Sequence, residues 1–181
     1  MKNQKSKSKD QTSIRAFTIV ECLIGLAISA ILLAAVAAAF SASLTNYREN
    51  ERMYQTINSA RQALMRMTSQ LRTAGYQVSP GPDGFVAVDE SAPSTQCNFY
   101  TSAGEDLSYI YSSTDKKLYL RTNSNNQQYT LCDNVVAASF VKTPTDDGMD
   151  CKSVQISLTV ENGGYRRTLS AAAVIRRNLG T

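Results

Sequence analysis

The run from Cys22 to Tyr47 carries no charged side chain, and it constrains the fold of this chain more than any other feature. A helix over residues 17–40 spans roughly 36 Å at about 1.5 Å per residue, enough to cross a hydrocarbon core of about 30 Å. The sequence has no Pro between Phe17 and Val78, so we expect a continuous helix without a kink. Gly25 and the Ala-rich tract 34–39 are small enough to let membrane helices approach closely.

Glu21 is the only ionisable carboxylate at the start of this segment. A charged side chain at the centre of a bilayer costs roughly 2.5–3.5 kcal/mol on insertion scales, so a carboxylate placed here needs a partner and a function. Glu21 is therefore the main candidate site residue.

Net charge separates the first sixteen residues from the rest of the chain. They contain five basic side chains and one acidic one, a net +4 that equals the charge of the whole sequence. The remainder is formally neutral, so the pI of about 8.9 reflects the basic side chains of the first sixteen residues. It therefore gives no reason to expect nucleic acid as a partner. By the positive-inside rule the basic end stays in the cytoplasm and the residues after the apolar segment are exported.

Residues 41–75 continue the helix in amphipathic form. Gly75 ends the pattern at a C-cap position, with Arg72 in the last turn where it favours the helix dipole. We expect the apolar stripe to dock on a sheet of the same chain. The stripe alternates spacings of four and three: Met53, Ile57, Ala60, Leu64, Met67, Leu71 and Ala74.

Residues 76–181 are typical of strands and turns. Residues 107–112 and 118–120 flank a polar turn and predict a hairpin, and a second polar turn leads to residues 129–131. Residues 134–141 and 154–160 are rich in β-branched and apolar side chains, and the turn at Asn162, Gly163 and Gly164 predicts a hairpin with residues 165–175. The fold class is thus α+β.

The segment from Ala16 to Glu21, AFTIVE, after a basic leader resembles the processing site of type IV prepilins and pseudopilins. The resemblance implies cleavage between Ala16 and Phe17 by a prepilin peptidase, N-methylation of Phe17, and neutralisation of a neighbouring subunit's terminal amine by Glu21. Most prepilins have Gly where this chain has Ala16. Residues 60–75 and 109–135 resemble the PilW-type minor pilins and the J-type minor pseudopilins of type II secretion.

This resemblance implies a type IV pilin-like fold with four regions: a cleaved leader (1–16), a transmembrane and assembly half of the helix (17–40), its amphipathic half (41–75), and an exported β-rich domain (76–181). The implied protein is a single-pass inner-membrane protein that enters, or primes assembly of, a pilus-like filament. Its implied partners are the peptidase, other minor pilins or pseudopilins, the major pilin and the membrane-embedded assembly platform.

Alternatives remain for both ends of the chain. An ordinary secretory signal could be cut after the run Ala37, Ala38 and Ala39. A lipoprotein signal would need a small residue before Cys22, where this chain has Glu21. A plain signal anchor would have no use for Glu21. The subunit could serve a type II secretion pseudopilus instead of a pilus. The C-terminal domain could also bind DNA or a surface through its Arg pairs at 166–167 and 176–177, although alternation along a strand would split such pairs between faces.

Four cysteines are consistent with an exported domain. Cys22 lies in the apolar segment as a packing residue. Cys132 and Cys151 precede two strands that, if they form a hairpin, start roughly 23 Å apart, beyond the reach of a disulfide of about 7 Å between Cα atoms. We therefore expect a Cys97–Cys132 disulfide with Cys151 unpaired, and Cys97–Cys151 stays open as the alternative.

Enzymatic chemistry is not expected. The sequence has no His, the commonest general base and metal ligand, and no Gly-rich phosphate loop. The acidic run 146–150 lacks the spacing and the final Glu of a calcium loop. We expect no catalytic residue, metal or cofactor.

Overall fold

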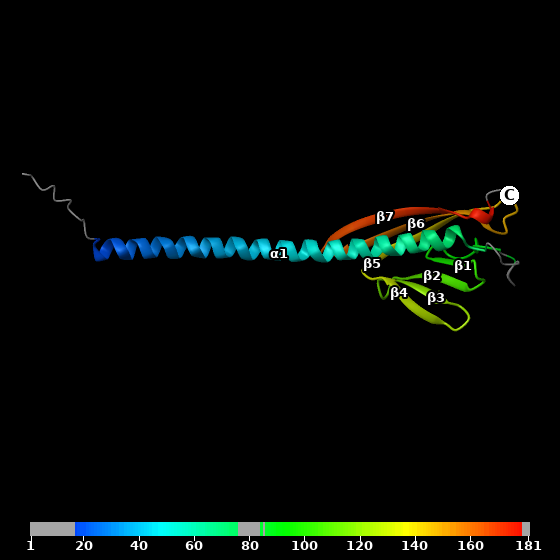
Figure 1. Cartoon of the computed structure of the whole chain (residues 1–181), viewed down its shortest axis with the longest axis horizontal. Coiled ribbons are helices and arrows are strands. Elements are labelled where there is room, and N and C mark those ends of the chain that lie inside the picture. Colours follow the sequence, from blue (N-terminus) through cyan, green and yellow to red (C-terminus); the bar gives the residue numbers. More distant parts are fainter. Residues whose placement is uncertain (1–16, 76–83, 85, 179–181) are drawn as a thin grey trace, which may run out of the picture. The chain divides into compact units, whose positions relative to one another are not determined.

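One long helix and seven strands make up the part of the chain that the computed structural model describes, namely residues 17–75, 84 and 86–178. The chain divides into an N-terminal unit that ends at Asn46 and a C-terminal unit that begins at Tyr47. The helix α1 runs from Ile19 to Arg72 and contributes to both units (Figure 1).

The N-terminal unit is helical over its described residues except for Phe17 and Thr18, which precede α1. Each residue from Phe17 to Asn46 is exposed, and an 18-residue window of α1 has a mean hydropathy of 2.6 with none of its residues buried. By length and composition this helix is able to cross a membrane. The continuous helix that the sequence predicts is confirmed.

The C-terminal unit contains two antiparallel sheets, with the second half of α1 running beside both of them (Figure 1). One sheet has the order β1-β2-β3-β4 and the other has the order β5-β6-β7. The strands are β1 (Gln96–Tyr100), β2 (Asp106–Ser112), β3 (Lys117–Thr122), β4 (Gln127–Cys132), β5 (Val135–Pro144), β6 (Cys151–Asn162) and β7 (Tyr165–Val174). A short 3₁₀ helix, η1, covers Arg176–Asn178.

The core of this unit lies between the helix and the sheets. Phe99, Tyr109 and Phe140 stack in a row, with ring centroids 4.9 and 6.4 Å apart, and so join β1 and β2 to β5 of the other sheet. Six of the seven predicted stripe residues are buried and five of them belong to this core, whereas Ile57 is only half-buried. The prediction that the stripe packs on the chain's own sheet is confirmed, and Thr56 supplies the buried position beside Ile57.

The turns at Gly75 and at Gly163–Gly164 match the predicted chemistry. Gly75 has a φ of +64°, and a Cβ there would lie 2.6 Å from the Val86 carbonyl oxygen, so both the conformation and the close approach require glycine. Gly163 and Gly164 both have positive φ, as a two-residue hairpin turn requires, and Asn162 pairs with Tyr165 across it.

The sequence did not predict β1 or the division of the strands into two sheets. All four cysteines are free thiols in this structure, and the strand order argues against the expected Cys97–Cys132 disulfide. Cys97 lies on β1 and Cys132 on β4, with β2 and β3 between them. Three strand spacings amount to roughly 14 Å, about twice what a disulfide spans between Cα atoms.

Candidate functional site

The start of α1 is built by Thr18 and Glu21 as a reciprocal cap. The Thr18 backbone N–H donates to the Glu21 carboxylate at 3.0 Å, and the Glu21 N–H donates to the Thr18 hydroxyl at 3.2 Å. The same hydroxyl donates to Glu21 Oε2 at 3.1 Å. This is a capping box, in which a Thr at the N-cap and a Glu three residues later satisfy two otherwise unpaired amides.

The cap also gives the Glu21 charge a favourable place. A carboxylate in the first turn interacts with the positive end of the helix dipole, an effect of about 0.3–1 kcal/mol at exposed sites. Among the described residues, the ion pairs are Lys117–Asp133, Lys152–Asp146 and Arg166–Glu161, and none includes Glu21. The carboxylate is thus oriented by neutral donors of its own turn and is exposed to a cation from outside the chain.

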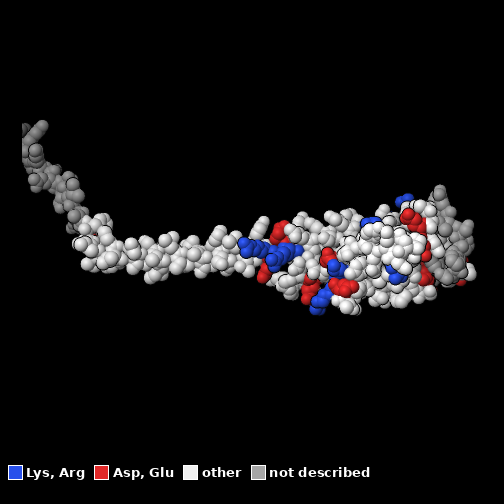
Figure 2. Space-filling view, turned by 90° about the horizontal axis from the view of Figure 1, so that it is seen from below, with Lys and Arg blue, Asp and Glu red and all other residues white. Residues whose placement is uncertain are grey.

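Apolar side chains surround this cap and extend along the N-terminal unit. Phe17 is 80% exposed, and Figure 2 shows no charged side chain over most of this unit on the face that it presents. The large exposed apolar residues that follow in this unit are Ile19, Val20, Leu23, Ile24, Leu26, Ile28, Ile31, Leu32, Leu33, Val36, Phe40 and Leu44. An apolar surface of this extent requires lipid or protein to cover it.

Two of the three predicted site residues at the N-terminus are described. Phe17 lies two residues before α1 and Glu21 lies in its first turn, whereas Ala16 lies outside the described residues. Thr18 was missed by the sequence analysis, although a Thr followed three residues later by a Glu is itself the sequence signature of a capping box.

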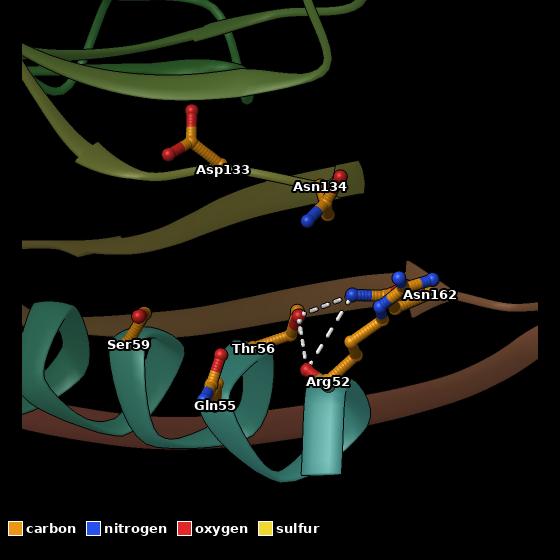
Figure 3. Close-up of a pocket in the computed structure, with 7 residues that line it drawn as sticks. All are labelled: Arg52, Gln55, Thr56, Ser59, Asp133, Asn134 and Asn162. Atoms are coloured by element: carbon orange, nitrogen blue, oxygen red, sulfur yellow. Dashed lines mark hydrogen bonds between the residues drawn. The ribbon is translucent and has the colours of Figure 1, made fainter. Parts of the chain in front are cut away.

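A polar pocket of about 200 Å³ lies in the C-terminal unit, where α1 meets the ends of the strands (Figure 3). Asn162, at the end of β6, donates from Nδ2 to the Thr56 hydroxyl at 2.9 Å and to the Arg52 carbonyl oxygen at 3.4 Å. The pocket's polar groups are therefore used in part to hold the helix on the sheet. Its lining residues are Arg52, Gln55, Thr56, Ser59, Asp133, Asn134 and Asn162.

The acidic turn after β5 is closed by its own hydrogen bonds. The Thr145 hydroxyl donates to Asp147 and accepts from the Asp150 N–H. The Thr145 hydroxyl and the Met149 N–H, which both donate to Asp147, lower the pKa of its carboxyl from the ordinary value. Within the part of the chain that the structure describes, no group of three His, Cys, Asp or Glu side chains could hold a metal ion.

The Arg residues considered for DNA binding do not share one environment, and two of them already contact other groups of the chain. Arg166 pairs with Glu161 in an ion pair, and Arg167 lies opposite Val160 in the β6–β7 register, so the two alternate across the sheet as predicted. Arg177 donates to the Gly75 carbonyl oxygen and thereby helps to close the end of α1.

Comparison of the chain with protein-family models and with curated protein sequences finds no match.

Proposed function

We propose that this chain is a minor pilin-like or pseudopilin-like subunit, cut between Ala16 and Phe17, N-methylated, and assembled into a pilus-like filament or its priming complex. The observation that carries the proposal is an exposed apolar helix that begins with the exposed Glu21 carboxylate of the capping box. This helix has no packing partner among the described residues. A helix of this kind suits a subunit that waits in the membrane and then packs against its neighbours.

The proposed chemistry is the pairing of the Glu21 carboxylate with the terminal amine of a neighbouring subunit. Within a bundle of apolar helices, water is excluded and an unmatched charge is heavily penalised, so opposite charges favour one register of neighbouring subunits. The capping box supports this role because it fixes the carboxylate at the end of the helix before any partner arrives.

The proposed partners follow from this role. They are a prepilin peptidase, other minor pilins or pseudopilins, the major pilin and a membrane-embedded assembly platform, with the C-terminal unit outside the cytoplasmic membrane. A J-type subunit at the tip of a type II secretion pseudopilus is the nearest alternative, since it would use the same helix. DNA capture is not proposed, because Arg166 already pairs with Glu161 and the rest of the chain after residue 16 is formally neutral.

The capping box allows a sharp test of the Glu21 role. Glu21→Gln keeps a side chain that can accept a hydrogen bond from the Thr18 N–H but removes the negative charge. Glu21→Ala removes both the acceptor and the charge. If the charge serves assembly, both variants should insert in the membrane normally and should be lost from sheared filaments, or from membrane complexes captured with companion subunits. The measurement is the amount incorporated, relative to the total membrane level.

Recovery of wild-type incorporation by Glu21→Gln would show that Glu21 acts as a cap and would refute the charge pairing. Thr18→Val is the matched control, since it removes the hydroxyl of the cap and keeps the carboxylate. On the proposed account it should reduce incorporation less than Glu21→Gln does.

A further inference from the structure

We propose that Cys97 and Cys151 form a disulfide that ties the four-stranded sheet to the three-stranded sheet. The inference rests on the proposed export of the C-terminal unit, because disulfides persist in oxidising compartments. Both side chains are fully buried in the core of that unit.

The loop before β1 brings the two cysteines together from one side. Val88 pairs with Phe99, so this loop runs antiparallel to β1, on which Cys97 and Phe99 face the core together. Asp150 Oδ1 accepts from the Val88 N–H at 2.9 Å and from the Cys151 N–H at 2.7 Å. One carboxylate oxygen thus joins the loop beside β1 to the residue that begins β6.

Strand β5 brings them together from the other side. The Phe140 N–H donates to the Ser94 carbonyl oxygen at 2.7 Å, which places the approach to β1 against β5. Further along β5, Pro144 pairs with Cys151. Lys142, between these two points, reaches back with its Nζ to the Ala92 carbonyl oxygen.

The charges around the two thiols agree with this placement. Burial raises the pKa of both thiols to about 12, and in each case the Lys142 ammonium opposes the rise. Cys151 is also close enough to raise the pKa of Cys97 electrostatically. Since the thiolate is the reacting form, oxidation has to take place during folding, before the core closes.

Cys132 is excluded as a partner of either residue. It is separated from Cys97 by two strands, and it precedes Val135, at the end of β5 opposite to the Pro144–Cys151 pair. Nine residues along a strand correspond to roughly 30 Å. Of the three cysteines in the C-terminal unit, only Cys97 and Cys151 are brought together.

The reaction exchanges one disulfide for another. With oxidised glutathione as the oxidant, the thiolate of one cysteine attacks a glutathione sulfur and forms a mixed disulfide, releasing one glutathione thiol. The second cysteine thiolate then attacks the protein sulfur of that mixed disulfide, and the second glutathione leaves as a thiol. Two protein thiols are oxidised and one glutathione disulfide is reduced to two thiols.

The test is to refold the full chain in detergent from its reduced, denatured state in a buffer of oxidised and reduced glutathione. Alkylation under denaturing conditions should then label two of the four cysteines, Cys22 and Cys132, and peptide mapping should find the Cys97 and Cys151 peptides linked. The Cys132→Ala variant should still protect two thiols, whereas Cys97→Ala and Cys151→Ala should each leave every remaining thiol labelled. Four labelled thiols in the wild type, or a linked pair that includes Cys132, would overturn the proposal.

The same labelling of the chain taken from membranes separates this inference from the proposed function. Protease accessibility of the C-terminal unit in spheroplasts reports export independently of the thiols. An exported unit with Cys97 and Cys151 both reduced contradicts the disulfide alone. A chain that is not exported contradicts the proposed function, and the refolding experiment still decides the disulfide.

Discussion

The N-terminal unit and the C-terminal unit use apolar side chains in opposite ways. Up to Asn46 the described residues are exposed and make only local hydrogen bonds, those of the helix, its cap and its hydroxyl side chains, whereas after Tyr47 the same helix packs its stripe into a core with two sheets. Burial of apolar surface provides about 25 cal/mol per Å² of stabilisation to the C-terminal unit, whereas residues 17–46, which are all exposed, obtain none from the described part of the chain. The first half of α1 therefore depends on surroundings that the second half does not need.

The largest expected effect contrasts two leucines of α1. Leu71 is fully buried, so Leu71→Ala should lower the free energy of unfolding of the C-terminal unit by about 2–5 kcal/mol through lost burial and a cavity. Leu33 is 70% exposed, and Leu33→Ala should change that free energy by less than about 0.5 kcal/mol. Urea unfolding of the detergent-extracted chain, followed by the near-ultraviolet circular dichroism of its Tyr side chains, measures both. Equal losses would mean that the first half of the helix also contributes to the core.

A second contrast concerns glycines. Gly75→Ala places a side chain at positive φ, which costs about 1–3 kcal/mol, and its Cβ would meet Val86 and Ala87, so the C-terminal unit should be destabilised by at least that much. Gly25 has open space around its Cβ position, and Gly25→Ala should raise helix stability by roughly 1 kcal/mol. The same unfolding curves, with far-ultraviolet dichroism for the helix, distinguish the two. A neutral Gly75→Ala would contradict the close approach of residues 86–87.

A smaller effect is expected at the contact between Thr56 and Asn162. A double-mutant cycle with Thr56→Val and Asn162→Ala should give a coupling of about 0.5–1.5 kcal/mol, as for one partly buried hydrogen bond. Thr45→Val is the matched control in the N-terminal unit, where the hydroxyl bonds only to the Ser41 carbonyl oxygen. Absence of coupling would show that the polar pocket does not hold the helix on the sheet.

The contrast also explains what the sequence could predict. The helix, its stripe and the strands from residue 107 onwards follow from local periodicity and turn residues, and the structure confirms them. β1 was missed because its strand is short and is defined by pairing with β2 and Val88, which the local pattern does not contain. The expected Cys97–Cys132 disulfide does not fit the strand order, which sets the distance between the two residues and which the local pattern does not contain. Thr18 could have been found, since its spacing from Glu21 is local.

The central claim is that the first half of α1 is a processed membrane and assembly segment, and the mass of the mature chain tests it most directly. We expect mass spectrometry of the membrane-extracted protein to find a chain that begins at Phe17 and carries one additional methyl group. Ala16→Leu should leave the leader attached, because a site that normally takes Gly does not accept a bulky side chain. A mature chain that begins at residue 40, after Ala39, would contradict the account, since it would identify the segment as an ordinary signal peptide that is removed.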